Sequence, residues 1–412
     1  MKDIHLMFNE LTERYRNYHE IVASFVRINT TNISEIQEIY QKFKSISSEI
    51  NVFPSGLIPC IFNAYKYNNR YLKSYYLIFK MFYDEFQIKF DSPEHQALSY
   101  FLNKEYGFPI GYRDQKLFGN YSLDLHEKNT IYRSIMDDDK DSFIVFIESE
   151  SFDKEQKLKH HFYPESSEGY SFLELCCYHG AVDCFKLLRT KFKSEITPQC
   201  LQFSFLSGKP EILNECLKFQ KPDQECMKYA IISFNIDFIT FLNREHGLDI
   251  DLETCRLWMN FQAFFVHLDI SKDIDNCFVY CANFGPSVLE YFISNGCNIN
   301  AKENKFKRTA LHIAVTTGNK ELIELLLYKG ANVHSKDSYG EKSLSYAVGL
   351  HYNKIVETLI KFGADYTSKD IIGAALFAAA RSNNYDVAEF LILNGANVNI
   401  GCPKVRLAQR SI

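Results

Sequence analysis

The sequence predicts an all-α fold, a solenoid of stacked helix pairs with an N-terminal helical region before it. Residues 310–330 carry the first observation: they form two short amphipathic patterns with apolar residues at i, i+3 and i+4, and Gly330 follows the second. The second observation is that the same pattern returns at a spacing of 33 and then of 32 (344 − 311 = 33, 376 − 344 = 32). Helices this short bury too little apolar surface alone, so each pair needs a neighbour that repeats it.

Residues 1–126 are predicted to be an atypical helical region. Apolar stripes at helical spacing run through three segments, residues 3–28, 34–46 and 71–86. A shorter helix is expected over 57–67, and Ser92-Pro93 is a start signal for another. We expect this region to dock on the first helix pair of the solenoid. The aromatic stripe of 71–86 could also form a groove for a partner helix, but core packing explains it more simply.

Residues 127–273 are predicted to be degenerate repeats. Gly180 follows Leu173 at the distance that separates Gly318 from Leu311 (180 − 173 = 318 − 311). The glycine returns at a spacing of 28 (208 − 180 = 28). Because these units are shorter than the regular repeats and lack a Gly-Ala ending, the hairpins between them should be short or missing. Residues 254–273 fit the repeat pattern ambiguously.

Residues 274–402 carry the regular repeats, and residues 403–412 form a C-terminal tail. Leu311 recurs as Leu344 and then as Leu376. The repeat spacing shortens from 33 to 32 residues, and the missing residue falls in a connecting loop, where deletions are tolerated best. Three of these units end in Gly-Ala followed by Asn or Asp, at 330–332, 363–365 and 395–397.

The segment Thr309–Ala314 reads TALHIA, and a period of 33 with a T-P-L-H-x-A start resembles the ankyrin repeat. The resemblance implies an ankyrin-type solenoid, in which inner helices and hairpin loops, the fingers, line a concave surface. It also implies that Thr309 caps the first helix of its repeat and that His312 hydrogen-bonds backbone between neighbouring repeats. A structural role for His312 is therefore favoured over a catalytic or metal-binding one.

A second resemblance rests on residues 170–181 (YSFLELCCYHGA), on residues 225–233 (ECMKYAIIS) and on the repeats from 274 onward, and it covers nearly the whole chain. In these stretches the chain resembles the expanded ankyrin proteins of trichomonad-type parasitic protozoa, in which a domain of unknown function precedes ordinary ankyrin repeats. This resemblance implies an intracellular interaction protein and names no partner.

Composition argues against several classes of partner. The net charge is −5 and the pI about 6.2, so the chain has no basic field for nucleic acid. No apolar run approaches the ~18 residues of a membrane span, so we expect no direct membrane insertion. The 12 cysteines are scattered without a C-x-x-C pair, which predicts reduced, partly buried thiols and a cytoplasmic location.

The sequence predicts no catalytic residue, no cofactor and no metal site. Cys177 and His179 carry ligand atoms, but no second Cys/His pair stands at zinc-finger spacing. Gly208-Lys209 imitates the end of a phosphate-binding P-loop, but Pro210 occupies the place of its Ser or Thr. Residues 137–139, all aspartates, are typical of a solvated loop.

We expect a protein partner to bind at the finger tips and at the ends of the inner helices, because stacking does not need those side chains. The candidate residues are Lys305, Phe306, Arg308, Ser338, Tyr339, Glu341, Ile371 and Ile372 on the fingers, and Thr316, Thr317, Leu350 and Arg381 on the inner helices. Aromatic and arginine side chains often dominate binding energy. The alternative is that the finger residues only pack on adjacent fingers.

These observations favour a non-enzymatic scaffold or adaptor that binds a protein partner through the concave surface and finger tips. Two alternatives stay open. The repeats could be the targeting arm of a regulatory or enzymatic N-terminal region, or they could link the chain to a membrane-associated protein. Residues 1–126 contain no defensible catalytic constellation, which counts against an enzyme there.

Overall fold

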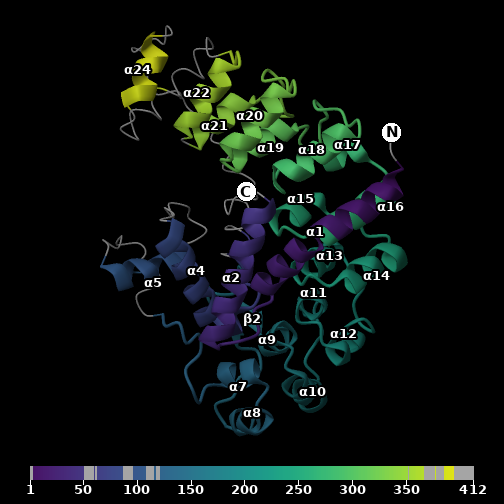
Figure 1. The fold of residues 1–412 in the computed structure, drawn as a ribbon. Helices are drawn as coiled ribbons and strands as arrows, with labels where there is room; N and C mark the ends of the chain where they lie inside the picture. Colours follow the sequence, from purple (N-terminus) through teal and green to yellow (C-terminus); the bar gives the residue numbers. More distant parts are fainter. Residues whose placement is uncertain are drawn as a thin grey trace. The chain divides into compact units, whose positions relative to one another are not determined.

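The computed structural model is all-α, as the sequence predicts (Figure 1). It describes residues 3–50, 60, 63–86, 96–107, 116, 121–350, 352–365, 376 and 385–393. Within these residues the only strands are β1 (Lys157–Leu158) and β2 (Tyr170–Ser171), which pair antiparallel. The fold therefore rests on helix packing and on loops.

Packing divides the chain into two compact units, each described here by itself. The short-repeat unit comprises Thr12–Ile46 and Leu57–Phe264. The finger-bearing unit comprises Met1–Leu11, Ser47–Gly56 and Phe265–Ile412.

Residues before 107 form α1 (Ile4–Val26), α2 (Ile33–Ile50), the short 3-10 helix η2 (Asn69–Tyr71), α4 (Leu72–Phe86) and α5 (Gln96–Tyr106). The predicted stripes correspond to α1, α2 and α4. Their shared core is aromatic: the ring of Phe43 lies 5.5 Å from that of Phe25 and 5.4 Å from that of Phe82. Of the expected helix over 57–67, the structure describes residues 60 and 63–67, of which 60, 63 and 64 are helical, whereas the Ser92-Pro93 start lies outside the described residues.

The short repeats are five helix pairs in the described chain: α7 (Ile131–Asp137) with α8 (Lys140–Ile147), α9 (Phe172–His179) with α10 (Val182–Lys191), α11 (Pro198–Ser207) with α12 (Pro210–Cys216), α13 (Gln224–Ile232) with α14 (Ile236–His246), and α15 (Leu252–Leu257) with α16 (Phe261–Ser271). The first members, the inner helices, pack on one another in succession. In Figure 1 the pairs from α9 to α14 follow one another through the teal part of the ribbon. The ambiguous stretch 254–273 is thus a further pair.

A left-handed residue separates the two helices of most short repeats. Gly180 and Gly208 have φ of 69°, and Phe234 and Met259 take the same conformation at 53° and 52°. The spacing of these residues is 28, 26 and 25 (208 − 180, 234 − 208, 259 − 234). A glycine there costs little because it has no Cβ, and a larger residue holds the conformation only when its surroundings impose it.

The finger-bearing unit contains longer repeats. Its described pairs are α17 (Ile274–Cys281) with α18 (Pro286–Ser294), α19 (Ala310–Thr316) with α20 (Lys320–Tyr328), and α21 (Ser343–Gly349) with α22 (Asn353–Lys361); α24 (Tyr385–Leu393) follows. The inner helices α17, α19 and α21 pack in order. Leu311 and Leu344 are both 1% exposed at the shared interface, so the residues that define the period also form the core.

His312 joins two repeats, as the resemblance implies. Its Nδ1 accepts the backbone N–H of Thr309 at 3.1 Å, and its Nε2 lies 3.2 Å from the carbonyl oxygen of Glu341 in the next repeat. Burial lowers the pKa of His312, which favours the neutral ring that this pattern needs, with one nitrogen accepting and the other donating.

The N-terminal region contacts the first helix pair, as expected, because the Arg70 guanidinium donates to the carbonyl oxygen of Met136 on α7, but its contacts extend further along the repeats. The hydroxyl of Tyr178 on α9 donates to the carbonyl of Lys66 at 2.9 Å. The ring of Tyr67 lies 6.0 Å from Tyr229 on α13 and 5.1 Å from Trp258, which follows α15. The physical reason is a row of aromatic side chains along the inner helices. The ring of Phe203 lies between those of Tyr178 and Tyr229, at distances of 5.2 and 5.4 Å. This row of rings therefore spans several helix pairs.

Candidate partner-binding surface

A buried carboxylate organises the first finger loop, residues 302–308. Glu303 is fully buried, and its carboxylate accepts the backbone N–H groups of Lys305 and Phe306, each at 2.7 Å, and of Arg308 at 3.1 Å. The hydroxyl of Tyr280 on α17 donates to it at 3.2 Å. Charge-assisted hydrogen bonds of this kind are stronger than neutral ones, so the loop has one preferred shape.

The second finger loop, residues 336–342, uses the same device. The Asp337 carboxylate accepts the N–H groups of Tyr339 and Glu341, both at 2.8 Å. The hydroxyl of Tyr346 donates to Asp337 at 2.7 Å, and burial raises the pKa of that phenol, which keeps it protonated as a donor. Both fingers are therefore rigid loops whose acidic residue points inward.

The tips of the two fingers stack on each other. The rings of Phe306 and Tyr339 are 6.2 Å apart and 26° from parallel, and the N–H of Ser338 donates to the carbonyl of Phe306 at 2.7 Å. Phe306 is half-buried by this contact, whereas Tyr339 is 69% exposed. The Lys305 ammonium and the Arg308 guanidinium lie 5.0 and 5.1 Å from the centre of the Phe306 ring. The result is an aromatic column with cations beside it.

Lysines dominate the exposed charge of the finger loops. Lys302, Lys305, Lys307 and Lys336 are exposed. The acidic residues of the same loops are the buried Glu303 and Asp337, which hold backbone N–H groups, and the half-buried Glu341. We call residues 302–308 and 336–342 together the finger surface. It is locally positive although the chain as a whole carries −5.

The candidate residues on the inner helices serve mostly local structure. Thr316 and Thr317 are half-buried, and their hydroxyls donate to the carbonyls of Ile313 and Ala314. Leu350 is half-buried at the end of α21. Ile371, Ile372 and Arg381 lie outside the described residues. The candidate binding surface is therefore described from the other predicted residues.

Sequence reasoning missed Glu303, Asp337 and the lysines at 302, 307 and 336. A signal for the carboxylates is present: Lys302-Glu303 and Lys336-Asp337 recur at a spacing of 34 (337 − 303 = 34). Burial of an acidic residue has no other sequence signature, because the partners are backbone N–H groups that every residue except proline carries.

Metal ligation and membrane crossing have no support in the described residues. His179, a zinc candidate by composition, has its Nε2 2.7 Å from the Tyr163 hydroxyl, and no cluster of three or more His, Cys, Asp or Glu side chains suited to a metal occurs in the part of the chain that is described. Among the described helices, none combines the length and the apolar character that a bilayer crossing requires.

Comparisons with known proteins agree with the repeat architecture. The family described as "Domain of unknown function (DUF3447)" matches residues 192–267, "Ankyrin repeats (3 copies)" matches 278–370, and "Ankyrin repeat" matches 374–402. A curated relative, potassium channel AKT2/3 of Arabidopsis thaliana, is 33% identical over 93 residues, which is 22% of this chain and 11% of the channel. The chain thus carries a DUF3447 segment followed by ankyrin repeats, which indicate a role in protein–protein interaction.

Proposed function

We propose that this protein is a non-enzymatic scaffold or adaptor that binds a protein partner through the finger surface and the adjoining ends of the inner helices. The observation that carries the proposal is the Phe306–Tyr339 stack. It holds a 69% exposed tyrosine on a loop that is fixed by a buried carboxylate. A rigid aromatic side chain loses little conformational entropy on binding, which makes it a good anchor.

The partner should present an acidic face. The lysines of the finger surface project around the aromatic column, and the local carboxylates of Glu303 and Asp337 are turned inward. Such a surface attracts an acidic partner at long range and repels a basic one, so charge sets the association rate and the choice of partner.

Among the described residues, the short-repeat unit offers no comparable free face on its inner helices, which supports the choice of the finger surface. Its inner helices already contact helices and loops from before residue 107 through Tyr178, Tyr229 and the neighbouring Trp258. The chain itself therefore occupies the face that a partner would use in that unit.

Three further points belong to the proposal. The chain is organised as an N-terminal helical region (1–126), degenerate repeats (127–273), ankyrin repeats (274–402) and a tail (403–412). It acts in the cytoplasm. It is related to the trichomonad-type expanded family, whose order of a domain of unknown function before ankyrin repeats it shares.

The test compares Tyr339→Ser with the matched control Tyr328→Ser. Tyr328 is also exposed, at 77%, and lies on α20 outside the finger surface. Partners captured from source cells by the wild-type protein should be lost with Tyr339→Ser and retained with Tyr328→Ser. Purified partner should lose about 1–4 kcal/mol of binding free energy to the first variant, measured by calorimetry. Retention of every partner by both variants would move the binding site away from the fingers.

A further inference from the structure

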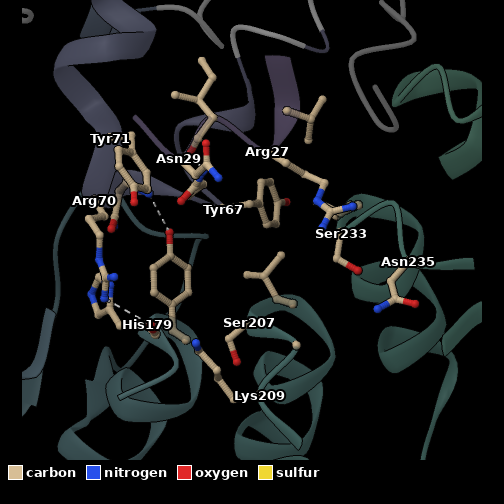
Figure 2. Close-up of a pocket in the computed structure, with 18 of the residues that line it drawn as sticks. Arg27, Asn29, Tyr67, Arg70, Tyr71, His179, Ser207, Lys209, Ser233 and Asn235 are labelled. Carbon is tan, nitrogen blue, oxygen red and sulfur yellow. Dashed lines mark hydrogen bonds between the residues drawn. The ribbon is translucent and has the colours of Figure 1, made fainter. Parts of the chain in front are cut away.

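The short-repeat unit contains a polar pocket of about 490 Å³. Its walls come from the end of α1, from the segment that leads into α4, and from the turns between the helices of three successive repeats. Figure 2 shows Arg27, Asn29 and Tyr67 approaching from one side and Ser207, Lys209 and Ser233 from the other. This volume lies in the range of about 300–1,000 Å³ that small-molecule sites occupy.

Cations line the pocket, and no described residue of its lining is an aspartate or glutamate. Arg70 is already used, because its guanidinium donates to the carbonyl oxygens of Met136 and His179 at the ends of α7 and α9. Arg27 and Lys209 differ: both are exposed, and neither side chain forms a hydrogen bond or ion pair with the described residues. Two cationic groups therefore face the pocket without a counter-charge from the described part of the chain.

The helix ends around the pocket do not cancel this charge. The C-termini of α11 and α13 carry partial negative charge, but the N-termini of α12 and α14 follow within a few residues and carry the opposite sign. Arg70 neutralises the carbonyl ends of α7 and α9. At the C-terminus of α1, the Tyr75 hydroxyl donates to the carbonyl of Val26 and the Asn68 amide to that of Ile28, which offsets part of the negative charge there. The charges of Arg27 and Lys209 are left in excess.

Uncharged donors complete the lining. The Ser207 hydroxyl is buried and has no hydrogen-bond partner among the residues that the structure describes. Asn29 and Asn235 add side-chain amides, and Tyr67 and Tyr71 add aromatic rings. A buried hydroxyl without a partner destabilises the fold, so a ligand that accepts from Ser207 would gain from it.

We propose that this pocket binds a small anionic molecule that carries phosphate groups, held by the Arg27 guanidinium and the Lys209 ammonium with the Ser207 hydroxyl as a further donor. Arginine and lysine are the side chains that most often bind phosphate, the first through a fork of donors and the second as a point charge. The tyrosine rings give an organic part of the ligand a surface to lie on. The site is independent of the finger surface, so either can exist without the other.

The test uses the full chain, with pyrophosphate and ATP as probes in calorimetry at constant ionic strength. Two variants remove the charges, Arg27→Gln and Lys209→Met. The second keeps an aliphatic stem over Gly180, where a Cβ would lie 2.8 Å from the Lys209 Cγ. The matched control is Lys186→Gln, an exposed lysine on α10 outside the pocket.

Both probes should bind the wild type at micromolar to millimolar concentration, and each pocket variant should weaken binding by about tenfold or more. Lys186→Gln should leave affinity unchanged, and thermal melts should report that all variants are folded. Tighter binding of ATP than of pyrophosphate would support recognition of the organic part as well as the phosphates. No binding of either probe, or equal binding by the pocket variants and the control, would overturn the proposal.

Discussion

The two units solve the same packing problem with different connections. Both stack inner helices in succession, but the turn between helices recurs at spacings of 28, 26 and 25 in the short repeats and of 33 from Gly285 to Gly318 (318 − 285 = 33). The additional residues form the fingers. The comparison teaches that stacking needs only the helix pair, and that the connection decides what the inner face does. Without fingers the inner helices carry an aromatic row that the chain itself covers; with fingers they are bordered by exposed loops that bear lysines.

The loss of stability in acid should be the largest difference between the two units. Burial lowers the pKa of His19, His126 and His160 to about 4 in the short-repeat unit, and lowers that of His179 well below its usual range. The folded state then binds fewer protons than the unfolded state, whose histidines titrate near ~6.5, so stability is lost as pH falls from about 6.5 towards 4.

Each of His19, His126 and His160 can contribute about 3 kcal/mol or less, and neighbouring ones do not add fully. In the finger-bearing unit, the pKa of His312 is lowered in the same direction. Hydrogen exchange at pH 7 and pH 5, corrected for intrinsic rates, should show protection falling more in residues 170–264 than in 310–350. An equal fall in both segments would contradict the assignment of the acid sensitivity to the buried histidines of one unit.

Truncation of the aromatic row should give the largest effect of any single substitution. Phe203 is fully buried and touches the rings of Tyr170, Tyr178 and Tyr229. Phe203→Ala should lower the free energy of unfolding by about 3–5 kcal/mol, because it removes buried area and leaves a cavity. Leu344→Ala at a stacking position of the finger-bearing unit is the comparison, at about 2–5 kcal/mol. Urea unfolding measures both, and a loss below about 1 kcal/mol for Phe203→Ala would mean that the row is not a cohesive core.

Loss of a finger's internal charge should cost less and act locally. Glu303→Gln removes the charge that strengthens three backbone hydrogen bonds and should cost about 1–3 kcal/mol. Hydrogen exchange should rise in residues 302–308 before it rises in α19. Glu324→Gln is the control, because Glu324 forms only a partly exposed pair with Lys320, worth at most about 1 kcal/mol. Equal effects of the two substitutions would show that the buried carboxylate does not organise the loop.

The smallest effect on stability is expected at the finger tip. Tyr339→Ser removes an exposed ring whose described ring contact is the stack on Phe306, so the free energy of unfolding should change by about 0.5 kcal/mol or less. A thermal melt checks this directly. A large fall in melting temperature would mean that the fingers serve packing rather than presentation of a binding surface.

The sequence was informative where the structure is periodic. The spacing of Leu311 and Leu344 located the stacking core, and the TALHIA motif identified the role of His312 correctly. It was uninformative where contacts join distant segments. Nothing in the residues around Tyr67 indicates that its ring meets Trp258, which is 191 positions further along (258 − 67 = 191). For the same reason, only part of the binding surface could be predicted from the sequence. The exposed Tyr339 has a local sequence signature. The inward orientation of Glu303 depends on a backbone conformation that a residue pattern does not encode.

The packing of α1 also bears on how the protein is made. Tyr18 lies against Phe261, with ring centres 5.2 Å apart, although Phe261 stands 243 positions further along the chain (261 − 18 = 243). At a synthesis rate of about 5–20 residues per second, α1 leaves the ribosome about 12–50 s before that partner. The part of its apolar stripe around Tyr18 lacks this partner for that whole interval, so the nascent chain should depend on a chaperone that shields amphipathic helices until the last short repeat has been translated.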